Sequence, residues 1–94
     1  MSDKHTYRQE DLRKSLMHRL SRIEGQVRGV RRMLEEETYC VDILTQVAAI
    51  RAALKGFSRE LLDSHVRGCV KDGIVRGEDA VVEELLDTIH KIMK

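Results

Sequence analysis

The sequence has no proline, no tryptophan and only three aromatic residues among its 94 positions. β-Sandwiches and barrels need aromatic side chains and turn residues, so this composition favours helix. No apolar run approaches the roughly 18 residues that a membrane span requires, and the N-terminal residues contain no apolar segment typical of a signal peptide. We therefore expect a cytoplasmic, all-helical protein whose residues 1–94 form a single domain.

Cysteine is also scarce, and the chain has only Cys40 and Cys69. In a reducing cytoplasm such cysteines are more often metal ligands, redox groups or small buried side chains than a structural disulfide. The net charge is +1, but residues 1–32 contain nine Lys and Arg against four acidic residues. This basic third is either a surface for a polyanion or a solvated helix face.

The spacing of apolar residues predicts three helices. Leucine, isoleucine and valine recur every three or four residues from 12 to 34, and together with Phe57 they do so from 43 to 61, as on one face of an amphipathic helix. We expect helices over about 8–36, 39–70 and 78–93, and disorder over the polar residues 1–7. A subunit this small buries a modest core alone, so we also expect it to oligomerise.

The second apolar stripe begins at Cys40 and, at the same spacing, reaches His65 and Cys69. Residues four apart share a helix face, so His65 and Cys69 can hold one metal ion. Cys40 lies 25 residues before His65, roughly 37 Å away along a helix, and cannot join them within one chain. If the helix packs antiparallel against its copy about an axis near residues 53–54, Cys40 of one subunit meets His65 and Cys69 of the other, twice.

Two thiolates and one imidazole form a soft, three-coordinate set that suits Cu(I), with one ion per subunit. Zn(II) would need a fourth ligand for a closed tetrahedral site, and none is evident. Simpler interpretations exist for each residue alone. A cysteine on an apolar stripe is often a small buried side chain, and a histidine near a helix C-terminus often interacts only with the helix dipole. The other histidines, His5, His18 and His90, fall off the pattern and are interpreted as surface residues.

Three stretches carry a family resemblance: R-L-S-R-I-E-G-Q-V-R-G-V at 19–30, Y-C-V-D-I-L-T-Q-V-A-A-I at 39–50, and L-L-D-S-H-V-R-G-C-V at 61–70. They resemble the copper-sensitive operon repressor (CsoR) family, over nearly the whole chain from about residue 12 to residue 93. The resemblance implies a disc-like tetramer of antiparallel four-helix-bundle dimers. It also implies that the apo form binds operator DNA without a helix-turn-helix, and that Cu(I) releases the DNA and derepresses copper-resistance genes.

The same resemblance assigns roles to individual residues. The family's Cys, His and Cys ligands map onto Cys40, His65 and Cys69, and the residues that support the ligands map onto Tyr39 and Glu84. For DNA, the resemblance points to basic residues of the first two helices, which would neutralise phosphates rather than read bases. These residues are Arg19, the best match, and its companions Arg22, Arg51 and Lys55.

Several other functions compete with this one. The nickel or cobalt branch of the fold uses an N-terminal His where this chain has Arg8, and often a His where it has Cys69. A persulfide sensor would link Cys40 to Cys69 across subunits without needing His65. A copper buffer or chaperone would not need the basic third of the chain. We expect neither an enzyme nor a small-molecule substrate, because a saturated three-ligand site leaves no open position and no acid–base pair or phosphate loop is evident.

Overall fold

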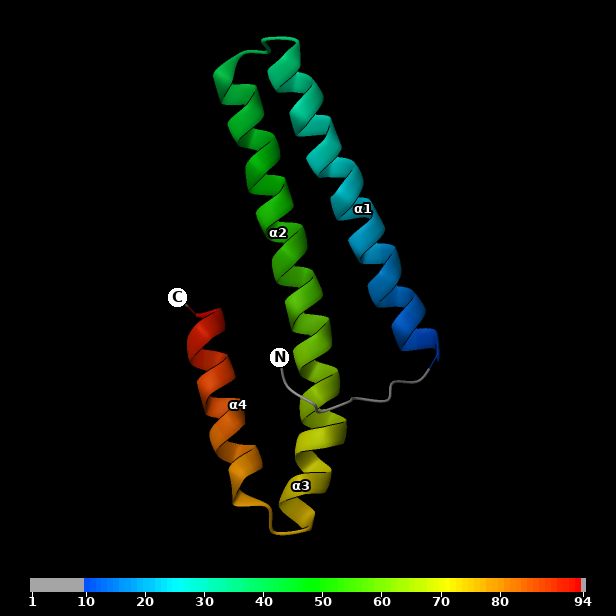
Figure 1. The fold of residues 1–94 in the computed structure, drawn as a ribbon, viewed down its shortest axis with the longest axis vertical. Coiled ribbons are helices and arrows are strands. Elements are labelled where there is room, and N and C mark those ends of the chain that lie inside the picture. The colour runs from blue at the N-terminus through cyan, green and yellow to red at the C-terminus, as the bar shows by residue number, and fades with distance from the viewer. Residues whose placement is uncertain (1–9, 94) are drawn as a thin grey trace. The chain divides into compact units, whose positions relative to one another are not determined.

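The chain folds into helices that form two compact units. The computed structural model describes residues 10–93, apart from the side chains of residues 69 and 70. The first unit ends at Leu61 and the second begins at Leu62. Residues 10–93 contain helices and turns but no strand, which confirms the all-helical class (Figure 1). The segment 1–7, for which we predicted disorder, lies outside the described residues.

The first helix, α1 (Glu10–Glu35), carries the first predicted apolar stripe. It begins with Glu10 and Asp11, where the helix dipole favours acidic side chains. The hydrogen bond from Arg13, reinforced by its positive charge, lowers the pKa of Glu10. Leu16 and Ile23 are the buried core residues of α1. Farther along the same stripe Leu34 stays 69% exposed, so one chain covers this stripe only in part.

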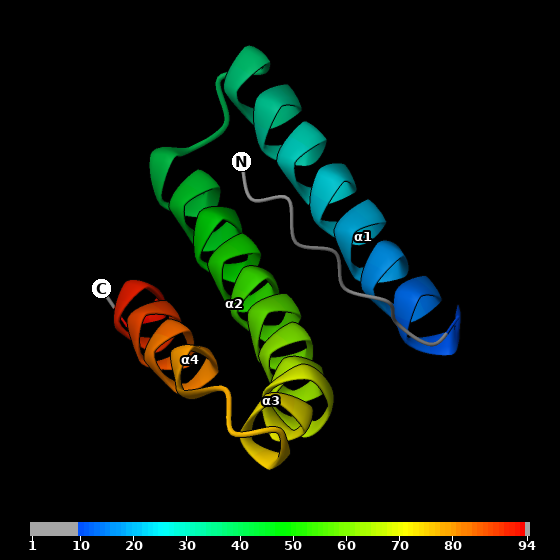
Figure 2. The ribbon, with the colours of Figure 1, turned by 60° about the horizontal axis from the view of Figure 1, so that its bottom comes forward.

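A tight turn reverses the chain after α1. Glu37 adopts the left-handed conformation, with φ of 54°. The N–H of Thr38 donates to the carbonyl of Met33 at 2.9 Å, and the N–H of Glu37 donates to the carbonyl of Leu34 at 3.2 Å. This pair of hydrogen bonds is a common way to end an α-helix. The short connection makes α1 and α2 (Cys40–His65) antiparallel neighbours within the first unit (Figures 1 and 2).

The stripe of α2 is covered less than that of α1. No residue of α2 is fully buried. Ile43, Ile50 and Phe57 are partly buried, whereas Val47 and Leu54 are 37% and 44% exposed. The α1–α2 hairpin therefore leaves much of the predicted apolar face of α2 open in the single chain.

After His65 the helical run continues farther than the expected end near residue 70. A π-helical turn, η1 (Val66–Val70), follows α2 directly, and α3 (Lys71–Val75) follows η1. The run stops where Gly77 adopts a left-handed φ of 77°. The N–H of Glu78 there donates to the carbonyl of Gly73 at 2.8 Å. The last helix, α4 (Asp79–Ile92), corresponds to the one expected over about 78–93.

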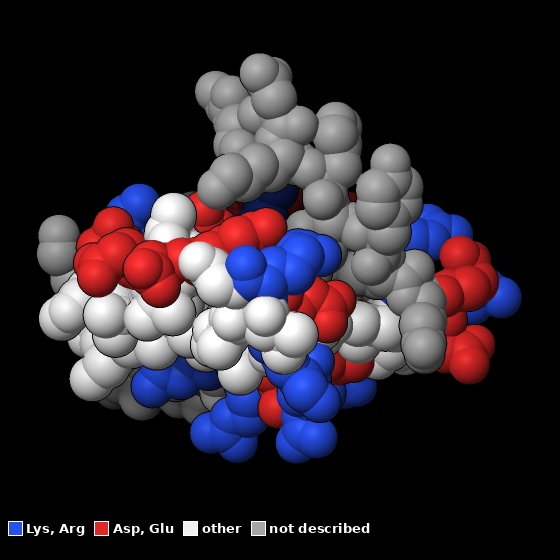
Figure 3. All heavy atoms as spheres, turned by 90° about the horizontal axis from the view of Figure 1, so that it is seen from below, with Lys and Arg blue, Asp and Glu red and all other residues white. Residues whose placement is uncertain are grey.

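In the second unit α4 folds back onto α3 and η1. Gly73 is the buried residue of α3, and a Cβ at this position would lie 2.6 Å from Cγ2 of Val81. Only glycine therefore allows the two helices to approach this closely. Ile74 and Val75 remain exposed. Figure 3 shows acidic, basic and uncharged side chains in the view from below. No helix within residues 10–93 is long and apolar enough to cross a membrane.

Candidate metal centre and nucleic-acid surface

The predicted metal ligands lie at the two ends of α2 and in the turn that follows it. Cys40 is the first residue of α2, and its free thiol is exposed. His65 is the last residue of α2 and is partly buried. Cys69 belongs to η1, but its side chain lies outside the described residues. The side chains that are described contain no group of three His, Cys, Asp or Glu that could hold a metal ion.

The residues expected to support the ligands lie in different elements. Tyr39 immediately precedes Cys40, the residue is 70% exposed, and its carbonyl accepts a hydrogen bond from the N–H of Asp42 at 3.0 Å. Glu84 lies on α4, and its carbonyl accepts a hydrogen bond from the hydroxyl of Thr88 at 2.9 Å. Cys69 itself lies in a π-helical turn, an irregularity that is often found at functional sites.

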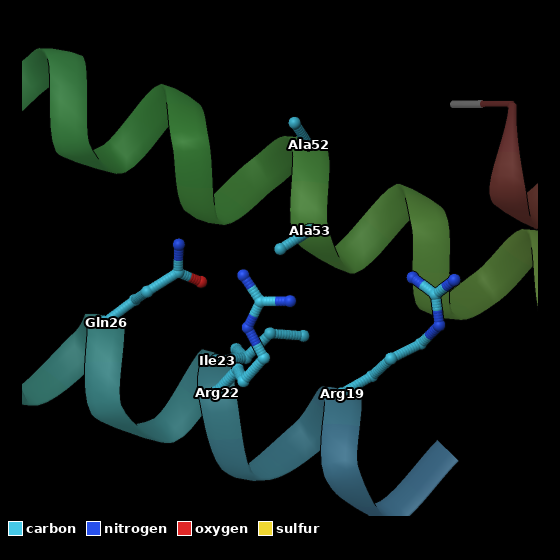
Figure 4. A pocket seen from close by; sticks show the side chains of 6 residues that line it. All are labelled: Arg19, Arg22, Ile23, Gln26, Ala52 and Ala53. Atoms are coloured by element: carbon cyan, nitrogen blue, oxygen red, sulfur yellow. The ribbon is translucent and has the colours of Figure 1, made fainter. Parts of the chain in front are cut away.

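The four basic residues predicted to contact DNA are all exposed. Arg19 and Arg22 lie one turn apart on α1, and Arg51 and Lys55 lie one turn apart on α2. Arg19 and Arg22 also line a cavity of about 320 Å³ within the first unit. Figure 4 shows both side chains reaching from α1 toward α2.

This cavity combines guanidinium groups with an apolar wall. Ile23 of α1 and Ala53 of α2 supply apolar surface, and Gln26 completes the α1 side (Figure 4). Oε1 of Gln26 is buried without a hydrogen-bond partner. Because a guanidinium presents a fork of N–H donors that matches phosphate oxygens, the two arginines suit a phosphate at the mouth of this cavity.

Sequence reasoning missed the residues around Arg19. Glu60 of α2 accepts hydrogen bonds from the Nε–H of Arg19 and from the hydroxyl of Ser15, the latter at 2.8 Å. Gly56, one turn before Glu60, faces the Arg19 guanidinium. The observed bounds explain the pairing, because two helices of 26 residues joined by four residues place residue 15 opposite residue 60 when they pair antiparallel. The charge pattern of the sequence carries no such signal.

Comparison with protein families identifies the chain. Residues 12–91 match the family described as metal-sensitive transcriptional repressor. The chain belongs to that family. The copper-sensing transcriptional repressor CsoR of Bacillus subtilis is 46% identical over 80 residues, which are 84% of this chain and 79% of that protein. The copper-sensing repressor RicR of Mycobacterium tuberculosis is 43% identical over 77 residues, 82% of this chain and 78% of that protein. The family resemblance predicted from the sequence is thus confirmed.

Solved structures of the family agree with this fold. The copper-sensing repressor CsoR with Cu(I) from Geobacillus thermodenitrificans matches with a TM-score of 0.90 and 42% identity, over 96% of this chain and 95% of that one. The nickel-responsive transcriptional regulator InrS matches with a TM-score of 0.74 and 40% identity, over 93% of this chain and 98% of that one. Members of this fold thus include proteins named for different metals, so the ligand set of the chain itself must identify its metal.

Proposed function

We propose that this chain is a Cu(I)-responsive transcriptional repressor. Its apo form binds operator DNA, and Cu(I) binding releases the DNA so that copper-resistance genes are expressed. Membership of the metal-sensitive repressor family and the similarity to copper-sensing relatives support this function. Because a repressor acts on DNA, we place the protein in the cytoplasm. We assign it no catalytic role.

The observation that carries the choice of metal is the ligand set. Cys40, His65 and Cys69 provide two thiolates and one imidazole, the soft donors that select Cu(I). The hard oxygen ligands that suit Mg²⁺ or Ca²⁺ are absent from this set. The exposed thiol of Cys40 and the partly buried ring of His65 are compatible with ligation.

The position of these ligands on α2 and η1 supports a site between subunits. Cys40 and His65 are the first and last residues of one helix, whose ends lie roughly 37 Å apart at 1.5 Å per residue. A second copy, antiparallel to the first, would bring its own Cys40 to His65 and Cys69. The exposed apolar residues of α2, such as Val47 and Leu54, provide the surface for that copy. We infer an antiparallel four-helix-bundle dimer with one Cu(I) per subunit, and two such dimers in a tetramer.

Other residues of the chain would orient the ligands and bind the DNA. We assign Tyr39, beside Cys40, and Glu84, on α4, to hydrogen bonds that fix the ligand side chains, as residues around a metal centre commonly do. We assign Arg19, Arg22, Arg51 and Lys55 to backbone phosphates. Cu(I) at the subunit boundary would change the packing of α2, and α2 also carries Arg51 and Lys55 of the DNA surface.

The first test measures DNA release. Wild-type apo protein is titrated against the DNA upstream of its gene in a gel shift, with and without Cu(I), and with Zn(II) and Ni(II) as matched controls. We expect Cu(I) alone to weaken binding, and by linkage the free protein must then bind Cu(I) more tightly than the DNA-bound protein by the same factor. Unchanged DNA affinity in Cu(I), or a stronger effect of Ni(II), contradicts the proposed function.

His65 separates copper sensing from persulfide sensing in the same assay. Both mechanisms need Cys40 and Cys69, but only the copper site needs the imidazole. His65→Ala should therefore lose the response to Cu(I) while any response to polysulfide survives. Full Cu(I)-driven release by His65→Ala, together with a stronger response of the wild type to polysulfide, would favour the persulfide function instead.

A complementation experiment tests the arrangement between subunits. Cys40→Ala subunits and His65→Ala/Cys69→Ala subunits each lack an intact site as homodimers. Their heterodimer should regain one intact site and bind about half a Cu(I) per subunit, since the ligands of that site come from different chains. If no Cu(I) binding returns after subunit exchange is verified by mass spectrometry, the ligands do not meet across the interface.

A further inference from the structure

Glu60 connects the two helices of the first unit through both of its carboxylate oxygens. Oε1 accepts a hydrogen bond from the hydroxyl of Ser15 at 2.8 Å. Oε2 accepts a hydrogen bond from the Nε–H of Arg19. The Glu60 side chain is only 23% exposed, whereas that of Arg19 is 46% exposed. The carboxylate is thus the sheltered partner, and the guanidinium is the partner that reaches solvent.

Gly56 lies beside the same guanidinium and leaves room for it. It lies one turn before Glu60 on α2, and a Cβ at this position would lie 3.0 Å from Nη1 of Arg19. This is tighter than most contacts of a Cβ atom, so a side chain here would shift the guanidinium by a few tenths of an ångström. The missing side chain of Gly56 therefore makes room for Arg19 beside the backbone of α2.

We propose that Glu60, with Ser15 and Gly56, is a positioning residue that holds Arg19 ready for a DNA backbone phosphate. This inference rests on the proposed function, in which Arg19 binds operator DNA. A guanidinium has five N–H donors, and the contact with Glu60 uses the Nε–H. Within the described residues that contact involves no Nη atom, so the four donors on the Nη atoms are left for a second anion. An arginine held in one conformation also loses less freedom when it binds.

A different mechanism would change the affinity for DNA in the opposite direction when the Glu60 carboxylate is removed. If Glu60 simply competed with phosphate for Arg19, or cancelled its charge, then removing the carboxylate would strengthen DNA binding. The two mechanisms are separated by comparing Glu60→Gln, which keeps an acceptor oxygen but loses the charge, with Glu60→Ala, which loses both. Positioning predicts a loss of affinity only in Glu60→Ala, whereas competition predicts a gain in both variants.

The experiment measures the affinity of the apo protein for its upstream DNA by fluorescence anisotropy at one salt concentration. We expect Glu60→Ala to bind about tenfold more weakly, the scale of one hydrogen bond to a charged group, and Glu60→Gln to stay within about threefold of wild type. Glu60→Ala should have no further effect in an Arg19→Ala background. Glu35→Ala, which removes an acidic residue from an exposed ion pair with Arg31 on α1, is the control for charge alone.

Gly56→Ala provides a readout that a purely structural role would not produce. Alanine favours helix over glycine, so this variant should be at least as stable as wild type toward heat. Its Cβ would shift the Arg19 guanidinium by a few tenths of an ångström and should weaken DNA binding. Wild-type or tighter binding by Glu60→Ala, or an equal loss when Arg19 is already alanine, overturns the positioning role. Both outcomes leave copper-dependent release by the wild type intact, so they differ from a failure of the proposed function, in which the wild type itself does not bind the DNA or does not release it.

Discussion

The close approach of α3 to α4 makes Gly73→Ala a quantitative test of the second unit. The added Cβ would lie 2.6 Å from Cγ2 and 3.0 Å from Cβ of Val81, whereas carbon atoms pack at about 3.5–4.0 Å. Either α4 moves by roughly 1 Å or Val81 leaves its rotamer. Such overpacking costs about 1–3 kcal/mol, and the better helix propensity of alanine offsets roughly 1 kcal/mol of it.

We therefore expect Gly73→Ala to lower the free energy of unfolding by about 1 kcal/mol. The assay is urea unfolding of the apo protein followed by circular dichroism, at one protein concentration, because assembly makes apparent stability depend on concentration. Val81→Ala removes the methyl groups that the new Cβ would meet, so the double variant should lose less than the sum of the single variants. A gain in stability from Gly73→Ala alone would refute the close contact.

Two further predictions concern helix ends and the core. Glu37 and Gly77 both adopt the left-handed conformation after a helix, so Glu37→Gly should raise the free energy of unfolding by about 1 kcal/mol and Gly77→Ala should lower it by a similar amount; changes of the same sign in urea unfolding would contradict this. Leu16 is 6% exposed and Leu34 is 69% exposed on the same helix. Leu16→Ala should therefore lower the free energy of unfolding by about 2–5 kcal/mol, clearly more than Leu34→Ala. A loss from Leu16→Ala no greater than that from Leu34→Ala would place the core elsewhere.

The sequence predicted the helices well and one helix end poorly. Apolar spacing identified α1, α2 and α4, because the direction of each side chain on a helix depends only on its position along that helix. The second helix was expected to end near residue 70, where Gly68 and Gly73 lie close by in the sequence. The chain instead continues through η1 and α3, and Gly77 supplies the left-handed turn. A glycine permits a helix to end but does not require it, and Gly73 serves the contact with α4.

Among the candidate site residues, those with distinctive chemistry could be read from the sequence alone. The donor atoms of Cys40, His65 and Cys69 are properties of single side chains, and their spacing on a helical stripe is a local property of the chain. The residues around Arg19 are different, since Glu60 follows it by 41 positions and acts only by contact. A charge pattern along the sequence does not say which arginine meets which carboxylate.

What the sequence by itself determined is therefore the helical class and the apolar faces, and it supplied the prediction of the metal donors; all three follow from residue type and helical periodicity. Only the tertiary structure decided that Ser15, Arg19 and Glu60 form one network, that Gly56 and Gly73 are sites of close approach, and that much of the α2 stripe stays exposed in one chain. The physical reason is that such contacts depend on the register and separation of paired helices. These in turn depend on how side chains far apart in the sequence fill the space between them.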